Sequence, residues 1–414
     1  MIGAARRFVS STYGGLPAVT WLICFAAFVN RAGSMVLPFL GIYLGRRFGL
    51  TVEESGYILS LYGVGSTIGN LIGGKLADVL GPIRVQLLTL TMAAAWMGAM
   101  TQFASVPTIA AGTFVLGLLN DAFRPGNMAA VLASVPPHLG PTALTLNRVM
   151  VNAGWAIGPT IGGLLARIDY QWLFLVDGST CALAALVLMA FVPTALGSRS
   201  AVAHAATVEA PADAARSTTS AWSDGKFLLL LLANIVTLLS FMQYFSTETR
   251  WLRDEFGATE DVIGYVLAIN PVLIVLFEMP LVRALAGRPR LPIVAFGTLL
   301  IGIAFPILTI SSLGMNGVVL QMLLLTIGEM FSFSPLGGFV GDRAAPGRRG
   351  QYLGMHGAAF SFAFMIAPSL GGAIYDRAGP DSLWWTCFSL ALIAAVGYLA
   401  LHRAYPPRPR TGAN

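Results

Sequence analysis

The stretch Gly154-Trp-Ala-Ile-Gly-Pro-Thr-Ile-Gly-Gly163 has a shorter counterpart 209 residues later in the chain. The counterpart reads Ala367-Pro-Ser-Leu-Gly-Gly372, so one Pro and two adjacent Gly residues recur in the same order at one constant spacing. A second, weaker match between the halves begins at Gly81 and Gly287, at a spacing of 206. Ordered Pro and Gly matches are hard to obtain by chance in apolar sequence, so the pattern predicts two related halves.

The whole chain is apolar and carries few charges. Hydrophobic residues make up 56% of the 414 positions and charged residues 11%, against about 25% charged in a typical soluble domain. A helix of roughly 20 apolar residues crosses the bilayer, and it satisfies its own backbone groups in lipid. The sequence therefore predicts an all-α integral membrane protein with twelve transmembrane helices, at 18–44, 55–77, 84–105, 107–133, 143–166, 171–193, 226–247, 261–283, 290–312, 315–340, 351–374 and 381–402.

A polar segment separates the sixth predicted helix from the seventh. Residues 195–222 are rich in Ala, Ser and Thr and show no apolar periodicity, which is typical of a linker. The predicted organisation is an N-terminal six-helix bundle at 1–194, a cytoplasmic linker at 195–222 and a C-terminal six-helix bundle at 223–414. Two related six-helix bundles are typical of secondary transporters.

The basic residues are distributed unequally between the two sides of the predicted helices. Of the 25 Lys and Arg residues, 17 fall on the side of the N-terminus and 6 on the other side. The positive-inside rule then predicts cytoplasmic termini and a place in the cytoplasmic, or inner, membrane. The net charge of +6 is thus a feature of topology, and no nucleic-acid partner is expected. The first 17 residues lack a signal-peptide cleavage pattern.

Few residues offer any other chemistry. The three cysteines lie in predicted spans without paired spacing, which indicates neither a disulfide nor a metal site; they are Cys24, Cys181 and Cys387. The four histidines are scattered, and no Gly-x-x-x-x-Gly-Lys-Ser/Thr phosphate loop is present. We therefore expect no cofactor, no catalytic residues and no ATP-driven pumping. A receptor is also disfavoured, because the longest loop of 28 residues is too short for a sensory domain.

The loop between the second and third predicted helices reads Gly73-Gly-Lys-Leu-Ala-Asp-Val-Leu-Gly-Pro-Ile-Arg84. It resembles the signature loop of the major facilitator superfamily, Gly-x-Leu-Ala-Asp-Arg-x-Gly-Arg-Lys, and departs from it at Leu80 and Pro82. The matching positions are Gly74, Leu76, Ala77, Asp78, Gly81 and Arg84. The resemblance extends to about residue 402 and implies two bundles that move a small solute by alternating access.

An acidic residue at a helix end can accept charge-assisted hydrogen bonds from an Arg or from a helix N-terminus. We therefore expect Gly74, Asp78, Gly81 and Arg84 to form a conformational latch between the halves. The alternative is an ordinary helix-ending turn with a solvated charge. The second half lacks the acidic position, in Leu281-Val-Arg-Ala-Leu-Ala-Gly287, so the latch is expected to be asymmetric.

The opening stretch resembles the fifth-helix motif Gly-x-x-x-Gly-Pro-x-x-Gly-Gly of antiporter branches of this superfamily. Its small residues allow two helices to approach closely, and Pro159 removes one hydrogen bond and bends the helix. The motif consists of Gly154, Gly158, Pro159, Gly162 and Gly163. Tight packing alone is the alternative interpretation, and related spellings occur in peptide symporters.

Ionisable residues within predicted spans are costly and are candidates for function. Asp121 and Arg124 are three positions apart, so a local ion pair is expected. Glu329 has no basic residue in its own span and needs a partner from another helix or a proton, since burial favours the neutral carboxyl group. The proton-coupling candidates are, in order, Glu329, Asp121 and Glu278. Buried pairs that fix helix register are the alternative.

A fixed positive charge in the first span can bind an anionic group of a substrate or pair with a carboxylate. This charge is Arg31, and the candidate cavity residues are Asn30, Arg31, Arg124 and Tyr244. Packing or interhelical bonding is the alternative for each polar or aromatic residue. Both glutamates of the peptide-transporter motif Glu-x-x-Glu-Arg are missing before Arg31, which makes peptide transport a minority interpretation.

The resemblance is greatest to the twelve-helix drug:proton antiporter branch. It implies a monomeric, proton-driven exporter of amphipathic small molecules or drugs, with protons as the coupling ion and the lipid bilayer as its surroundings. The alternative is a proton-coupled symporter that imports peptides, organic anions or metal chelates, because sequence does not give the direction of coupling.

Overall fold

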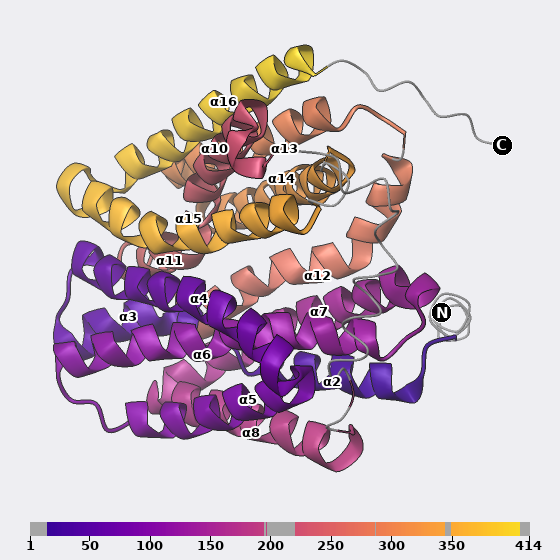
Figure 1. Ribbon diagram of the computed structural model, residues 1–414. Helices are drawn as coiled ribbons and strands as arrows, with labels where there is room; N and C mark the ends of the chain where they lie inside the picture. Colours follow the sequence, from indigo (N-terminus) through magenta and orange to yellow (C-terminus); the bar gives the residue numbers. More distant parts are fainter. Residues whose placement is uncertain (1–14, 194–195, 197–219, 286, 344–348, 406–414) are drawn as a thin grey trace, which may run out of the picture.

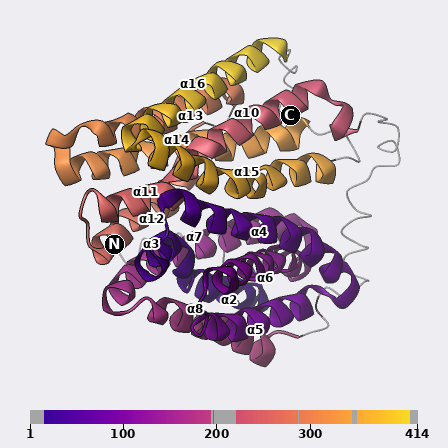
Figure 2. The same ribbon diagram turned by 90° about the vertical axis from the view of Figure 1, so that its left-hand side faces the viewer.

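The structure is a computed structural model that describes residues 15–193, 196, 220–285, 287–343 and 349–405. Throughout these residues the regular structure is helical, and no strand occurs. The helices form two stacked bundles, with the first half of the chain below the second half in Figure 2. The predicted all-helical membrane fold is confirmed. Most of the predicted linker lies outside the described residues.

Each half contributes six membrane helices, and the first helix of each half is divided into two segments. The first half consists of α2 (Ala18–Ala32), α3 (Val36–Phe48), α4 (Val52–Leu80), α5 (Pro82–Met100), α6 (Val106–Ala133), α7 (Gly140–Ile168) and α8 (Gln171–Phe191). The second half consists of α10 (Gly225–Phe241), α11 (Gln243–Asp254), α12 (Glu260–Ala284), α13 (Arg290–Ala304), α14 (Gly314–Arg343), α15 (Arg349–Ala378) and α16 (Pro380–Ala404). Figure 1 shows their order.

Among the described residues, 11 helical segments are long and apolar enough to span a membrane. The remaining predicted span is α4, which has 29 residues but is rich in Gly and charged residues. Its glycines explain how it is accommodated, because side chains at Gly65 and Gly69 would overlap the backbone of α6. A helix enclosed by protein in this way needs fewer apolar side chains than one that faces lipid.

The breaks in the first helix of each half follow the repeat found in the sequence. Segment α2 ends at Ala32 and α10 ends at Phe241, which is 209 positions later. The starts of α7 and α15, and those of α8 and α16, are also 209 positions apart. Gly81 and Gly287 both have positive φ, at 91° and 79°, so the weaker sequence match corresponds to the same sharp turn in each half. The predicted duplication is therefore present in the fold.

The halves meet through two contacts that the same repeat relates. A Cβ atom at Gly56 of α4 would overlap the backbone of Pro368 in α15, and one at Gly264 of α12 would overlap the backbone of Pro159 in α7. The two prolines are 209 positions apart. We call these contacts, Gly56 with Pro368 and Gly264 with Pro159, the paired glycine seals.

The seals lie toward one end of the molecule. We call the end at Thr51, Thr259 and Gly379 the distal end, and the end at Gly81 and Gly287 the linker end. Toward the linker end of α4 and α15, a Cβ atom at Gly74, Gly354 or Gly357 would meet nothing within 4 Å. In Figure 1, α4 and α15 lie together on the left and diverge toward the right. The halves are therefore packed at the distal end and separated at the linker end.

Candidate substrate and proton site

Glu329 lies midway along α14 and faces α12. Its Oε2 accepts a hydrogen bond of 2.6 Å from Nδ2 of Asn270, and the same nitrogen lies 3.2 Å from the Thr326 hydroxyl. Among the described residues, no Lys or Arg forms an ion pair with Glu329. The partner expected from another helix is thus a neutral amide. A carboxyl group held only by neutral partners in a membrane interior can exist with or without its proton.

Glu278 connects the two halves. It is 8% exposed on α12, and its carboxylate accepts hydrogen bonds from the Arg148 guanidinium of α7 and from the Ser334 hydroxyl of α14. Arg148 also donates to Ser334 at 3.2 Å. Arg148 lies in the third turn of α7. This ion pair therefore joins the two halves, and its partner Ser334 is five positions after Glu329 on α14.

The first half carries a second polar group around Asp121 of α6. The Asp121 carboxylate is 8% exposed and accepts a hydrogen bond from the Ser66 hydroxyl of α4. It also forms the expected ion pair with Arg124, at 3.4 Å. Asp121 therefore has a cationic partner that Glu329 lacks, which distinguishes the two leading carboxyl candidates.

Two further candidates lie at the end of α2. The Asn30 side chain is buried and donates a 3.4 Å hydrogen bond to Sγ of Cys181, so its amide is used in packing. Arg31 is half-buried in the last turn of the same segment. Of these two residues, Arg31 is the one whose surface is partly exposed.

An aromatic layer crosses the middle of the molecule. It consists of Tyr62, Trp155, Phe245 and Phe364, whose rings belong to α4, α7, α11 and α15. Ring centroids are 5.6 Å apart for Tyr62 and Phe364, 5.5 Å for Trp155 and Phe245, and 6.3 Å for Phe245 and Phe364. Tyr244 extends the layer through contacts with Phe241 and Phe245. Both halves contribute rings, so the layer forms only when the halves approach.

Two arginines within the membrane helices have exposed side chains. The side chains of Arg124 and Arg148 are each 56% exposed although both lie well inside membrane helices. A guanidinium group within a membrane faces water or a partner rather than hydrocarbon. Their exposure, together with the free space beside Gly74 and Gly357, indicates an aqueous space between the halves that opens at the linker end.

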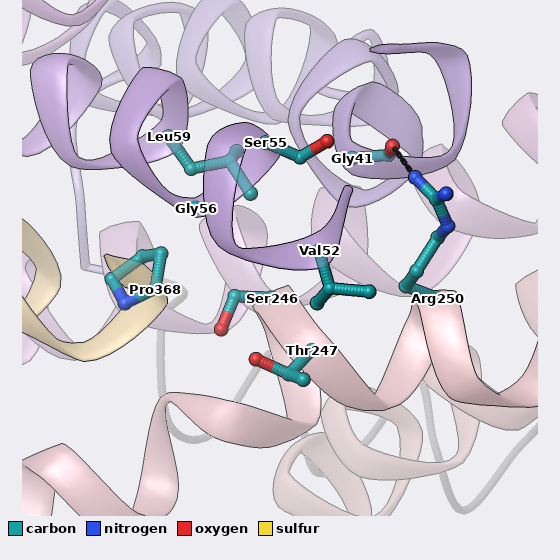
Figure 3. Close-up of a pocket in the computed structure, with 9 residues that line it drawn as sticks. All are labelled: Gly41, Val52, Ser55, Gly56, Leu59, Ser246, Thr247, Arg250 and Pro368. Carbon is teal, nitrogen blue, oxygen red and sulfur yellow. Dashed lines mark hydrogen bonds between the residues drawn. The ribbon is translucent and has the colours of Figure 1, made fainter. Parts of the chain in front are cut away.

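Arg250 closes the distal end. Its guanidinium donates to the Gly41 carbonyl at 2.9 Å and to the Leu50 carbonyl at 3.2 Å, and it forms an ion pair with Asp254 on its own helix. Figure 3 shows it beside a small pocket of about 10 Å³ between the halves, which Ser55 and Ser246 also line. One side chain of the second half thus binds two backbone carbonyls of the first half.

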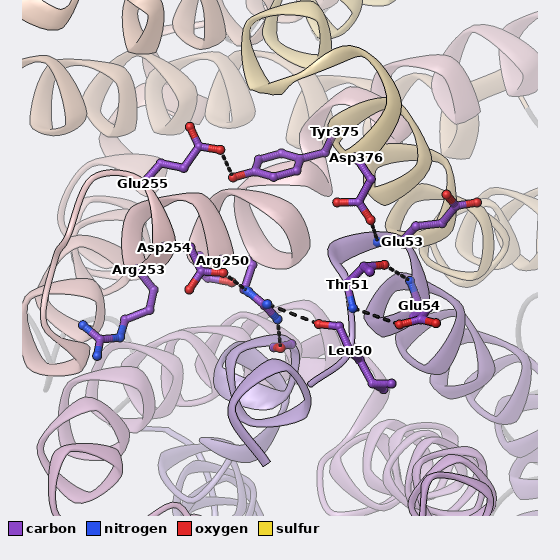
Figure 4. A network of polar contacts seen from close by, with 12 residues as sticks. Leu50, Thr51, Glu53, Glu54, Arg250, Arg253, Asp254, Glu255, Tyr375 and Asp376 are labelled. Atoms are coloured by element: carbon purple, nitrogen blue, oxygen red, sulfur yellow. Dashed lines mark hydrogen bonds and ion pairs between the residues drawn. The ribbon is translucent and has the colours of Figure 1, made fainter. Parts of the chain in front are cut away.

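Further polar contacts surround Arg250 at the distal end (Figure 4). Arg377 of α15 binds Glu53 of α4 at 2.6 Å, and Arg167 of α7 binds Asp261 of α12 at 3.3 Å. Each pair joins the end of the fifth helix of one half, α15 or α7, to the start of the second helix of the other half, α4 or α12. These exposed ion pairs add little individually, and their positions repeat the arrangement of the paired glycine seals.

The fifth-helix motif serves two interfaces. Side chains at Gly154 and Gly158 would overlap or crowd α2, and one at Gly162 would overlap Met35. Gly163 instead approaches the backbone of Glu260 in the opposite half. The motif therefore packs α7 within its own half and seals it against the other half. Pro159 takes part through its carbonyl, which lies against Gly264.

The proposed latch residues all lie at the linker end, where the halves are separated. Asp78 and Arg84 are exposed, and neither forms an ion pair within the described residues. Gly81 forms the turn between α4 and α5, and Gly74 faces open space. No latch is formed in this arrangement of the halves, and its role stays a prediction.

Two charged side chains of the second half were not predicted as site candidates, because the seventh span was predicted to end at residue 247. The helix continues as α11 to Asp254, so Glu248 and Arg250 lie inside the protein rather than in a loop. Segment α11 reads Gln243-Tyr-Phe-Ser-Thr-Glu-Thr-Arg-Trp-Leu-Arg-Asp254, and it is too polar to be detected as a membrane helix. The alternation of Ser, Thr and charged residues in this segment is the sequence feature from which a helix enclosed by protein could have been predicted.

Two pseudo-symmetric bundles, buried carboxyl groups at mid-membrane and an aqueous space open to one end define a secondary transporter. The family model of the Major Facilitator Superfamily matches residues 23–250 and 229–414. The chain belongs to this superfamily, so it is a transporter and not an enzyme.

The individual proteins that this chain resembles share about a quarter to a third of the aligned residues with it. The chain is 26% identical over 394 residues to the uncharacterized MFS-type transporter YttB of Bacillus subtilis (strain 168), covering 92% of this chain and 94% of that protein. It is 32% identical over 179 residues to a multi-drug resistance efflux pump PmrA homolog of Lactococcus lactis subsp. lactis (strain IL1403), covering 42% and 43%.

A solved structure supports the fold independently. The crystal structure of a POT family transporter in complex with a thioalcohol conjugated peptide matches with a TM-score of 0.78, covering 95% of this chain and 97% of that one. The sequences are 17% identical, so this likeness concerns the fold alone.

Proposed function

We propose that this chain exports amphipathic small molecules or drugs in exchange for protons. The observation that carries the proposal is the carboxyl group of Glu329, which is held by Asn270 without a cationic partner in the described residues. Such a group can take up a proton from one side and release it to the other. Asp121 and Glu278 are second candidates, because each is already paired with an Arg.

The aromatic layer supports the substrate class. Its four rings offer flat apolar surface contributed by both halves, and Tyr244 adds a hydroxyl group. Aromatic side chains with a few polar groups suit ligands that have an apolar body and a polar or cationic end. The partial similarity to a multidrug efflux pump points the same way. Arg31 and Arg124 favour the alternative, import of an organic anion or peptide, because they are positively charged.

Orientation and coupling form part of the proposal. We place the linker end in the cytoplasm, on the basis of the positive-inside distribution of Lys and Arg, and the protein in the inner membrane as a monomer. The described arrangement is then open to the cytoplasm. Protonation would favour one arrangement of the halves and substrate the other, because a ligand shifts populations only through different affinities for the two states.

The decisive experiment measures substrate flux in proteoliposomes with an imposed pH gradient. The panel should contain lipophilic cations, peptides, organic anions and metal chelates. We expect lipophilic cations to leave the compartment that faces the linker end while protons enter it. Accumulation of a peptide or an organic anion together with protons would instead support the symport alternative and contradict export.

The latch gives a separate prediction. Asp78→Asn should slow transport by about tenfold, because a hydrogen bond to a charged group that forms when the linker end closes is worth about 1.5–3 kcal/mol, and the neutral one that Asn can still make about 0.5–1.5 kcal/mol. Substrate affinity should change little, since Asp78 lies far from the aromatic layer. The measurement is flux and equilibrium binding in the same preparation. Flux equal to that of the unsubstituted protein would show that Asp78 is only a solvated helix end.

A further inference from the structure

Two buried side chains in the second half have oxygen atoms without a partner. Glu248 on α11 is 1% exposed and Gln321 on α14 is 0% exposed. Nε2 of Gln321 donates a 3.0 Å hydrogen bond to Oε2 of Glu248. Within the described residues, Oε1 of Glu248 and Oε1 of Gln321 have no hydrogen-bond partner. Both free atoms are acceptors, so the pair lacks a donor or a positive charge.

No neighbouring cation supplies that charge. In the part of the chain that the structure describes, no Lys or Arg forms an ion pair with Glu248. Arg250 is two positions along α11, about 200° around the helix, and its guanidinium binds Gly41 and Leu50 of the first half. An unpaired carboxylate enclosed in a membrane protein carries a large free-energy penalty.

The pair is distinct from the site around Glu329. Gln321 and Glu329 are eight positions apart on α14, which is about 12 Å along the helix axis. Glu329 is bound by Asn270 of α12, whereas Glu248 is bound by Gln321. The two carboxyl groups therefore have separate partners on separate helices.

We propose that Glu248 and Gln321 bind one monovalent cation, a proton or an alkali-metal ion such as Na⁺. A single positive charge between the two free oxygens satisfies both acceptors and neutralises the carboxylate. Divalent cations are disfavoured, because the single carboxylate of Glu248 balances only one positive charge and the second would stay uncompensated in a buried site.

The position of the pair indicates when the cation exchanges. Segment α11 also carries Arg250 and Ser246, which face the first half at the distal end. Opening the distal end must move α11 away from the first half, whereas the described arrangement encloses Glu248 completely. The site thus retains its cation while the linker end is open and exchanges it when the distal end opens.

The test measures cation binding by the purified full-length protein in detergent and needs no transported substrate. One arm measures bound ²²Na⁺ at alkaline pH, where protons are scarce. The other arm measures proton uptake with a pH indicator after an acid step in medium free of alkali-metal ions. The unsubstituted protein should bind one equivalent more than Glu248→Gln in one of the two arms, and that arm identifies the cation. Identical binding by both proteins in both arms would overturn the proposal.

Two further variants serve as a control and as a second test of the site. Glu54→Gln is the matched control, because Glu54 is exposed, caps the start of α4 and can be replaced there by Gln. Its binding should equal that of the unsubstituted protein. Gln321→Leu keeps the carboxylate but removes both the free acceptor oxygen and the Nε2 donor to Glu248. Half-saturation should then require about tenfold more Na⁺, which loses a ligand, but fewer protons, because the charged carboxylate loses the hydrogen bond that stabilises it. If Glu248→Gln does not fold, an unchanged midpoint in Gln321→Leu would overturn the proposal.

Discussion

Glu329→Gln is expected to abolish proton-coupled flux while leaving exchange of substrate across the membrane at least partly intact. Gln keeps the size of the side chain and can still hydrogen-bond to Asn270, so packing between α12 and α14 should survive. It cannot carry a proton, so it mimics the neutral carboxyl group permanently. The protein should then alternate with substrate bound but gain no energy from a pH gradient.

Two assays in proteoliposomes separate these properties. Uphill accumulation under an imposed pH gradient should fall to the level of liposomes without protein, while counterflow of labelled against unlabelled substrate should persist. Glu54→Gln removes the same charge at an exposed site and should retain both activities. Uphill accumulation that survives in Glu329→Gln would remove Glu329 from the coupling mechanism and leave Asp121 as the leading candidate.

The paired glycine seals give the second large effect. Gly264→Ala should force α12 away from the backbone of Pro159, because the added Cβ atom has no space there. Overpacking of this kind costs about 1–3 kcal/mol, which corresponds to a fall of about 5- to 150-fold in the population closed at the distal end. Gly56→Ala should have the same effect through Pro368, since the two contacts are related by the repeat.

Spin labels or single cysteines at the distal end would report this change directly as a longer distance or faster modification. Gly98→Ala is the control, because it lies in α5, where an added Cβ atom meets nothing within 4 Å. It should leave the conformation unchanged and slightly favour folding, as Ala does over Gly within a helix. Unchanged distal accessibility in both seal variants would show that other contacts, such as those of Arg250, determine closure.

The architecture was largely predictable from the sequence. Apolar segment length located the helices, and the shared Pro and Gly residues gave the 209-residue repeat that also relates Ala32 to Phe241 at the two helix breaks. The breaks themselves were not predicted, because each lies inside a segment that was assigned as one span, at 18–44 and at 226–247. The packing of the two halves was only partly predictable. The glycines indicated that helices approach closely, but they did not show that Gly163 faces the other half.

The site was less predictable, because it depends on partners from distant segments. The pairing of Asp121 with Arg124 followed from their spacing on one helix. The pairing of Glu278 with Arg148 joins residues 130 positions apart and has no local signature. Glu248 was hidden for a different reason, since the polarity of α11 made it look like a loop. Hydropathy detects helices that face lipid and fails for a helix enclosed by protein on most sides.

The half-exposed Arg148 has a consequence for the electrical behaviour of the protein. Water that reaches this side chain extends the aqueous phase of the linker end deep into the molecule, so the membrane voltage falls mainly across the packed distal portion. An elementary charge that crosses the whole voltage gains about 2.3 kcal/mol per 100 mV. A proton that moves between Glu329 and the linker end crosses little of this field, whereas one that enters from the distal end crosses most of it. Membrane potential should therefore act mainly on the steps that take place while the distal end is open.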